Sequence, residues 1–352
     1  MSNTYRWNLI DYIKNEEIIE AYNEIPSMDN YPAANQWQYI LPIIDHYFDV
    51  NKTCFAILYS DDKPIFIMPI SIFTVKKFFL DWQEIGFPFH NHVNLIKLPN
   101  ILIDSDVLMN NLITLCKERF GDKWSRFTIR NIQTTVKNIE YCDQVSYFET
   151  ESHSSTKQIV SKKHLRNIKR LEKKLASDKG DMNFTINTPT LTTSLNEFID
   201  IEKTSWKGKE GVALFSSPRL LDTYNAFSKN FNQDKMVIAK LEIDHKLIAS
   251  TLGFHLGDTI YIHKISHDQA YSEYAPGNIL ILKMLEHALN DKEIGTLNLV
   301  TSPTWAKRWH PKTTDIRNIV YFNGNNYGKF LKFIIFTWRK YKPSLKSIMN
   351  LK

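Results

Sequence analysis

One stretch limits the fold more than any other, because it predicts a strand, a loop, a helix and a second strand in close succession. The strands cover 258–266 and 295–300, and the helix runs from Pro276 to about Asn290. Proline suits a first helical turn because its φ is preset, and Gly277 lacks the Cβ that would keep a ligand from the backbone. The free amides of this turn, at the positive end of the helix dipole, can bind a phosphate or pyrophosphate. The same pattern also describes an ordinary helix start.

Apolar periodicity predicts the other elements. A polar junction is expected at 150–158, between two halves of the chain. In the first half we predict a β-hairpin at 55–73, a helix at 107–119 and a strand at 124–132. In the second half we predict a helix capped by Ser161, helices at 190–206 and 218–231, and three strands within 236–266.

The two halves share a detail that suggests a common origin. Residues 61–65 and 244–248 each join an aliphatic strand to another apolar strand. A duplicated domain leaves such similarity, although two ordinary hairpins also explain it. The elements together predict an α/β fold, and a duplication would give both halves the same topology, with their hairpins, 55–73 and 238–254, superposed. The predicted units are 1–153, 154–325 and a basic tail helix at 326–352.

Composition favours a globular cytoplasmic protein. Of the 352 residues, 43% are hydrophobic and 13% aromatic, which is ample for a sizeable core. No apolar run approaches the ~20 residues of a membrane-spanning helix, and the N-terminus lacks the apolar region of a signal peptide. Cys54, Cys116 and Cys142 are widely spaced and match no metal or redox pattern, so we expect structural thiols in a reducing compartment.

The net charge of +6 is moderate, but basic residues gather in two segments. The segment 161–175 is either a solvated helix face or a clamp for an anionic ligand. The aromatic tail at 327–346 either lies on an anionic surface, at the periphery of the inner membrane, or packs its aromatic side on its own domain, which we expect. After Asp315 there is no acidic residue, and the basic residues are Arg317, Lys329, Lys332, Arg339, Lys340, Lys342, Lys346 and Lys352.

Four motifs in the second half carry a resemblance to a known family. They are Lys163-His164-Leu165-Arg166-Asn167 with Arg170, Glu202-x-x-Ser205-Trp206-Lys207 with Gly211, Tyr271-x-x-Tyr274-Ala275-Pro276-Gly277, and Trp305-Ala306-Lys307-Arg308-Trp309. From about residue 155 to 322, their order and spacing resemble the Gcn5-related N-acetyltransferase (GNAT) superfamily. The similar branch is the double-domain one, with BioF2-like and cellulose-biosynthesis-type (CelD-like) acetyltransferases, relatives of the FemAB peptidoglycan transferases. The resemblance implies tandem GNAT-like folds.

The resemblance also implies the ligand and its site. Acyl-CoA, as co-substrate, would lie in the gap between the strands at 259–265 and 296–300, and no metal is expected. Only Gly277 remains of the usual phosphate loop, Gln/Arg-x-x-Gly-x-Gly/Ala. The expected cofactor-binding residues are Lys264, Tyr274, Ala275, Pro276, Gly277, Asn278 and Lys307.

The general base has several candidates. Glu202 is a candidate for the base because it precedes the Trp206-Lys207 loop, which in the family borders the acceptor side of the cleft. Its alternative role is that of a solvated helix carboxylate. His263 and Lys264 should face opposite sides of their strand by alternation. His263 has a suitable unperturbed pKa, and a hydrogen-bonded core histidine is its alternative role. Further candidates are Tyr261, which could protonate the leaving thiolate, His267 at the strand end, and His90 and His92, which could line the cleft but are too few for a metal site.

Three functional classes follow from these observations. The leading one is an acyl-CoA-dependent N-acyltransferase, with acetyl as the expected acyl group, acting on an amino sugar or another small-molecule amine in cell-envelope polysaccharide synthesis. The second is a FemAB-like transferase that uses aminoacyl-tRNA, although 161–175 is too short for the coiled-coil arm of those relatives and nucleic acid is not an expected partner. The third is a non-catalytic basic binding protein.

Overall fold

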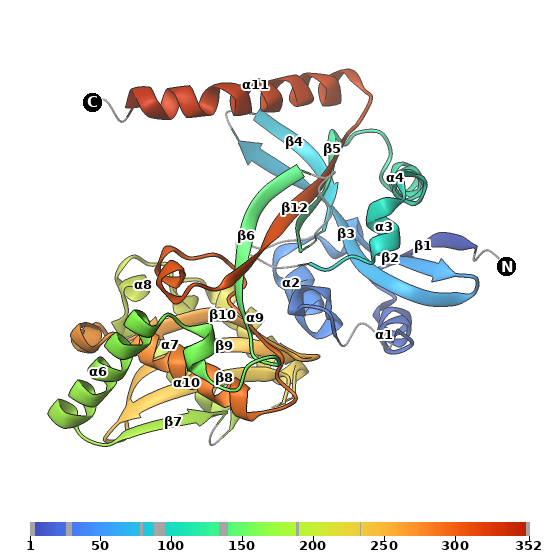
Figure 1. The fold of residues 1–352 in the computed structure, drawn as a ribbon. Coiled ribbons are helices and arrows are strands. Elements are labelled where there is room, and N and C mark those ends of the chain that lie inside the picture. The colour runs from blue at the N-terminus through green and yellow to red at the C-terminus, as the bar shows by residue number, and fades with distance from the viewer. Residues whose placement is uncertain are drawn as a thin grey trace.

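The computed structural model describes residues 4–25, 30–77, 80–87, 96–133, 140–187, 190–232 and 234–349. Its strands form one mixed sheet of 12, with helices on both faces, so the α/β prediction is confirmed (Figure 1). The first half contains β1 (Tyr5–Asp11), α1 (Asn15–Asn23), η2 (Ala33–Asn35), α2 (Trp37–Tyr47), η3 (Val50–Lys52), β2 (Thr53–Ser60), β3 (Lys63–Lys77), β4 (Leu80–Gly86), α3 (Asn100–Asp104), α4 (Asp106–Phe120), β5 (Arg126–Gln133) and β6 (Glu140–Glu149).

The second half repeats this order after two extra helices at its start. It contains α5 (Thr156–Ile159), α6 (Lys162–Lys179), β7 (Met182–Ile186), α7 (Leu191–Thr204), α8 (Trp206–Lys209), η4 (Leu214–Ser216), α9 (Pro218–Asn230), β8 (Met236–Ile243), β9 (Lys246–Leu256), β10 (Thr259–His267), η5 (Gln269–Tyr274), α10 (Pro276–Asn290), β11 (Thr296–Asn298), η6 (Thr304–Trp309), β12 (Lys312–Phe322) and α11 (Asn326–Met349).

The strand pairing shows that the two halves share one topology. β1 to β4 pair antiparallel in sequence order, and β5 then joins β4 in parallel. β7 to β10 and then β11 follow the same scheme. A parallel neighbour needs a crossover, which α3 and α4 supply in one half and α10 in the other. The predicted repeat of one topology is therefore confirmed.

The halves also exchange their last strands. β6 pairs antiparallel with β11 of the second half, and β12 pairs antiparallel with β5 of the first. β6 and β12 pair with each other, so they run side by side between the halves (Figure 1). The two halves consequently share one continuous sheet, and separating them would break three strand pairings, β5 with β12, β12 with β6 and β6 with β11. The boundary after residue 153 stays a prediction.

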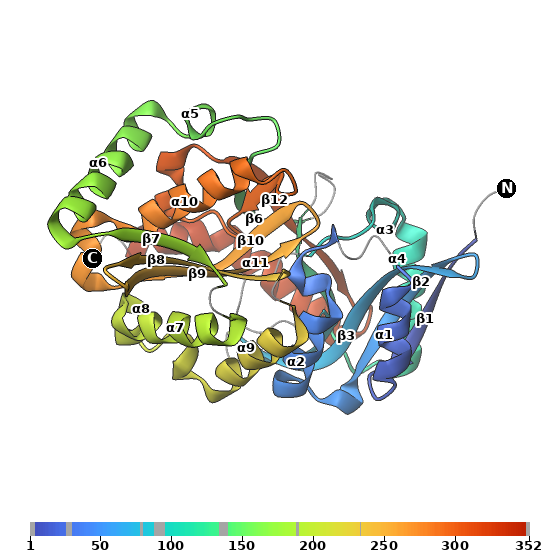
Figure 2. The same ribbon diagram turned by 90° about the horizontal axis from the view of Figure 1, so that it is seen from below.

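Helices cover the two faces of the second half differently. α6 and α10 lie on one face of β7 to β10, and α7 to α9 lie on the other (Figure 2). On the second face, α2 of the first half packs against α9, where the rings of Tyr39 and Phe227 stack with centroids 4.4 Å apart. Phe254 of β9 meets the Tyr39 ring edge-on. The first half and the α9 face of the second half therefore share one hydrophobic core.

The tail helix α11 contacts the body of the protein mainly through β12 and extends beyond the sheet (Figure 1). Leu331 is buried, but Phe330, Phe333 and Phe336 are 46%, 65% and 54% exposed. The expectation that the tail packs its aromatic side on its own domain is therefore wrong for these residues, because only one narrow stripe of the helix reaches the sheet. Within the described residues, no helix is long and apolar enough to span a bilayer.

Candidate functional site

A gap opens between two parallel strands in the middle of the second half. β10 pairs with β11 only from Thr259 to Tyr261, opposite Thr296 to Asn298. β11 ends at Asn298, whereas β10 continues to His267. The later part of β10 therefore has no strand on this side, and an unpaired strand edge offers N–H and C=O groups to an extended ligand.

A β-bulge lies where the strands part. The pairing of β10 with β9 shifts between Ile262 and Lys264, which leaves His263 as the extra residue. The His263 ring lies 5.7 Å from the Tyr39 ring and 4.9 Å from the Phe254 ring. The Lys264 amine lies over the ring of Tyr224, 5.5 Å from its centroid. Both side chains thus point toward the α2 and α9 side, and the prediction of opposite sides is wrong, because a bulge interrupts alternation.

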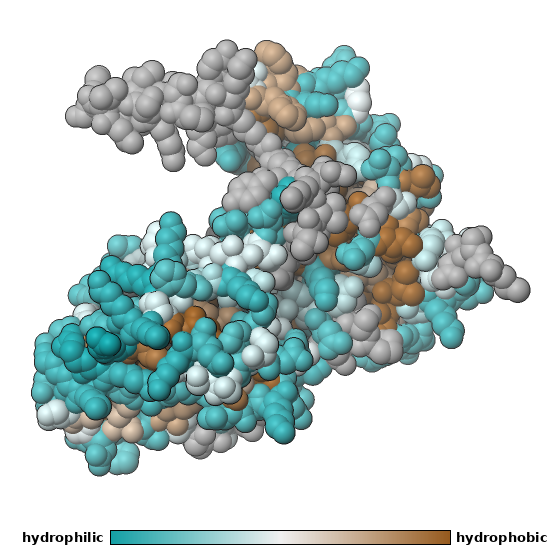
Figure 3. All heavy atoms as spheres, viewed as in Figure 1, coloured by the Kyte–Doolittle hydropathy of each residue, from teal (hydrophilic) through white to brown (hydrophobic). Residues whose placement is uncertain are grey.

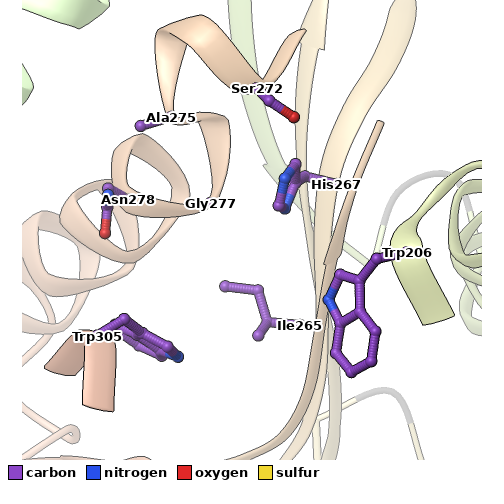
Figure 4. A pocket seen from close by; sticks show the side chains of 8 residues that line it. All are labelled: Trp206, Ile265, His267, Ser272, Ala275, Gly277, Asn278 and Trp305. Atoms are coloured by element: carbon purple, nitrogen blue, oxygen red, sulfur yellow. The ribbon is translucent and has the colours of Figure 1, made fainter. Parts of the chain in front are cut away.

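The predicted helix start lines a pocket of about 320 Å³ beside this gap. Ile265 and His267 of β10 face Asn278 of α10 and Trp305 of η6 across the pocket (Figure 4). The remaining lining residues are Trp206, Ser272, Ala275 and Gly277. The structure therefore brings together the end of β10, the first turn of α10 and a tryptophan from each of two other motifs.

The first turn of α10 offers one free amide to the pocket. Ala275 adopts the left-handed conformation at φ 51°, and its own amide donates to the Ser272 carbonyl. The Asn278 amide donates to the Ala275 carbonyl, and Pro276 has none to donate. The Gly277 amide makes no hydrogen bond to the described part of the chain. Of the free amides predicted for this turn, the Gly277 amide is therefore available to an anion, together with the helix dipole.

Glu202 is fully buried at 0% exposure and lies behind the pocket instead of lining it. One carboxylate oxygen is 3.3 Å from the Lys207 amine, and the other accepts the Leu214 amide at 2.6 Å. The Lys207 amine also donates to the Ile265 carbonyl at 2.9 Å, in the part of β10 beyond its pairing with β11. A general base must reach the proton that it removes, so these contacts favour a positioning role for Glu202 through Lys207.

Two cationic candidates differ in their surroundings. Burial lowers the pKa of Lys264 to about 8, although Glu202 opposes this shift, and Lys207 adds to it. Lys264 therefore belongs to the Glu202 and Lys207 cluster and does not line the pocket. Lys307 is exposed on η6, two residues after Trp305.

Tyr261, His263 and Tyr274 do not line the pocket. Burial lowers the pKa of His263 to about 3, and Lys264 adds to this shift, so His263 is a neutral ring in an aromatic core. Burial raises the pKa of Tyr261 to about 12, and this residue lies in the closed part of the gap. The Tyr274 hydroxyl donates to Asp178 on α6 at 3.2 Å. His90 and His92 lie outside the described residues.

His267 was a further candidate, at the end of the strand. It lines the pocket, and burial lowers its pKa, while Asp268 opposes and Lys207 adds to the shift. Its imidazole is therefore neutral near pH 7 and can accept a proton. In the sequence, the feature that indicated His267 was its position at the end of a predicted strand. Within the described ranges, no three acidic, histidine or cysteine side chains are grouped to hold a metal ion.

Comparisons with known proteins give one family match and several matches in fold. Residues 162–308 match the family model described as an acetyltransferase (GNAT) domain. The crystal structure of FemX is 8% identical, covers 92% of this chain and 97% of that chain, and has a TM-score of 0.58. No curated protein sequence matches the chain.

Two further solved structures have similar folds. The C-terminal domain (DUF2156) of a proposed lysylphosphatidylglycerol synthetase from Agrobacterium fabrum is 10% identical, with 92% and 96% of the chains covered and a TM-score of 0.51. A conserved protein of unknown function from Bacteroides thetaiotaomicron is 12% identical, with 91% and 100% covered and a TM-score of 0.52. At these identities, the matches show a shared fold.

Proposed function

We propose that this chain, whose residues 162–308 match an acetyltransferase (GNAT) domain and whose fold is similar to that of FemX, transfers an acyl group from acyl-CoA to an amine. The observation that carries this proposal is the unpaired edge of β10 beside a pocket that ends at the free Gly277 amide. The gap accepts the extended thioester arm, and the helix start accepts its pyrophosphate. The acceptor that we propose is an amino sugar or similar amine of cell-envelope polysaccharide synthesis, on the strength of the family resemblance.

His267 supplies the proton acceptor in this proposal. The amine nitrogen attacks the thioester carbonyl, a C–N bond forms and the C–S bond breaks. The proton of the amine passes to the neutral His267 ring, and CoA leaves as the thiolate. Trp206 and Trp305 border the pocket and limit the access of water, while the Lys207 contact with Ile265 fixes the strand edge. Positioning of the two reactants supplies most of the remaining acceleration.

A FemAB-like transfer from aminoacyl-tRNA is the second candidate, because FemX has a similar fold. Against it, α6 ends at Gly180 and β7 begins at Met182, so α6 is a single helix and not half of a coiled-coil arm. Thermal unfolding with acetyl-CoA, CoA and tRNA separates the two candidates, because a ligand of the native state raises the melting temperature. We expect stabilisation by acetyl-CoA and CoA alone. Stabilisation by tRNA alone would favour the second candidate or a non-catalytic basic protein.

Replacing Gly277 by valine is expected to weaken CoA binding by about tenfold or more, with little loss of stability. A Cβ here would meet Ile265 and His267 at 3.6 and 3.8 Å, which are ordinary contacts, so the helix is not strained. The added methyl groups would instead occupy the approach to the Gly277 amide. Calorimetric titration with CoA measures the effect, and Gly324→Val, at a site with open space, is the control. Equal CoA affinity in Gly277→Val and Gly324→Val would rule out a phosphate site at the Gly277 amide.

We also propose that α11 contacts an anionic membrane surface. Its exposed Phe330, Phe333 and Phe336 recur every three residues, and no acidic residue follows Asp315 in the sequence. Apolar side chains and lysines on one helix suit the boundary of an anionic bilayer. Cosedimentation with vesicles of phosphatidylglycerol should fall severalfold in Phe330→Ser/Phe333→Ser. Exposed Phe215 of η4 provides the control, Phe215→Ser, and equal binding of all three proteins would contradict the proposal.

A further inference from the structure

A second pocket, of about 590 Å³, lies between α6 and η6. Lys163, Arg166 and Arg170 occupy one face of α6, because they recur at intervals of three and four residues. Arg308 of η6 faces them across the pocket. We call this the basic pocket, and its remaining lining residues are Ser161, His164, Asn167 and His310.

The charges of the basic pocket are not neutralised by the protein. No carboxylate lines it, and within the described residues none of its four cations forms an ion pair. On the same helix, Lys169 pairs with Glu286 at 3.7 Å and Lys174 with Glu273 at 2.9 Å. Like charges that share a small volume repel one another, so an anion bound among them is favoured. Figure 3 shows a hydrophilic surface over this part of the second half.

The side chains of the basic pocket suit a phosphate group. Its arginines carry planar guanidinium groups, which bind phosphate through two parallel hydrogen bonds. The Nε2 atom of His164 is buried and has no hydrogen-bond partner among the described residues, and the His164 ring lies 4.9 Å from the Trp309 ring. Burial lowers the pKa of His164, and Arg308 and His310 add to the shift. A bound anion would give this nitrogen a partner and offset the neighbouring positive charges.

The basic pocket is adjacent in sequence to the proposed acyl-CoA pocket. Trp305 of η6 lines the acyl-CoA pocket, and Arg308, one turn later, lines the basic pocket. α6, which lines the basic pocket, also contacts α10 and η5, whose residues line the acyl-CoA pocket. η6 therefore contributes to the lining of both pockets.

We propose that the basic pocket binds a phosphate ester carried by one of the two reactants, either the 3′-phosphate of the acyl donor or a phosphate on the acceptor. The inference rests on the proposed function for the identity of the reactants. The recognition of phosphate itself stands on the residues of the basic pocket alone. Both sources present the same chemistry, a phosphate group with up to two negative charges.

Inorganic pyrophosphate is the probe that tests the site directly. Arg166→Gln/Arg308→Gln should weaken its binding to the full chain by about tenfold or more, because two charge-assisted contacts are lost. Lys169→Gln/Lys174→Gln removes the same charge from ion-paired positions on α6 and should bind pyrophosphate like wild type. Thermal unfolding of each variant checks that it is folded. The proposal would be overturned if Arg166→Gln/Arg308→Gln bound pyrophosphate as tightly as wild type. It would also be overturned if only Gly277→Val lost pyrophosphate affinity.

The source of the phosphate is identified by comparing CoA with 3′-dephospho-CoA. If the 3′-phosphate occupies the basic pocket, wild type prefers CoA, and the arginine variant loses that preference. If the acceptor carries the phosphate, the wild type and the arginine variant each bind CoA and 3′-dephospho-CoA with equal affinity. Pyrophosphate and CoA should then bind to the wild type at the same time. Arginine-dependent pyrophosphate binding without any CoA binding would leave the basic pocket in place and reject the acyl-CoA function. A loss of tRNA binding alone, with pyrophosphate binding unchanged, would make the surface a polynucleotide site and overturn the proposal.

Discussion

Replacing His267 by alanine is expected to lower kcat by about 10²-fold or more while CoA affinity stays near that of wild type. His267 lines the pocket at the end of β10, and its neutral ring can take the proton of the incoming amine. Steady-state kinetics with acetyl-CoA and an amine acceptor measure the effect. His263→Ala is the matched control, because His263 sits on the same strand but within the aromatic core.

The pH dependence gives a second test of the same residue. Burial lowers the pKa of His267 below the usual 6.5, so the ring is neutral above that value. As the pH is lowered from about 7, the wild-type rate should stay constant until the pH reaches the lowered pKa of His267. Below that pKa the rate should fall, because the ring is protonated. The residual rate of His267→Ala should lack this acid limb. Full activity in His267→Ala, with an inactive His263→Ala, would place the base on the other side of the strand.

Glu202→Gln is expected to cost about 3 kcal/mol of unfolding free energy, because breaking a buried ion pair leaves Lys207 without its charged partner. The rate should fall as well, since the Lys207 contact with the β10 edge depends on this pair. Chemical denaturation measures the first effect and kinetics the second. Asp200→Asn provides the control on α7, because its exposed pair with Lys203 is worth about 0–1 kcal/mol.

The two roles of Glu202 are separated by a double variant. If Glu202 acts by positioning, Glu202→Gln/Lys207→Met should recover part of the lost stability, because no unpaired charge remains buried. A Glu202→Gln protein of normal stability that has lost 10²-fold in kcat would instead identify Glu202 as the general base.

Local chemistry made the helix starts predictable. Ser161 accepts the His164 amide at the start of α6, Thr190 caps α7, and Pro276 begins α10 at the predicted residue. These features depend on residues within a few positions of one another, which a sequence displays directly. The pocket at the start of α10 was predictable for the same reason, since Gly277 and its neighbours follow the strand along the chain.

Features that depend on distant pairing were not predictable. The bulge at His263 is visible only in the pairing of β10 with β9. It turns Lys264 to the same side as His263, whereas strand alternation predicted opposite sides. The exchange of β6 and β12 between the halves joins residues that are at least 147 positions apart, from Glu149 to Thr296, which no local pattern encodes. The alternative role of Glu202, a solvated helix carboxylate, is wrong because the side chain is buried, and one of its oxygens accepts the amide of Leu214, which lies beyond the end of α7.

Hydrogen–deuterium exchange of the wild-type protein with and without acetyl-CoA tests the central claim most directly. The account places the donor on the edge of β10 beyond Tyr261 and on the first turn of α10. Acetyl-CoA should therefore slow exchange at residues 262–267 and 277–279, with little change at the equivalent strands β4 and β5 of the first half. Unchanged exchange at 262–267 and 277–279 under saturating acetyl-CoA, or protection confined to the first half, would contradict it.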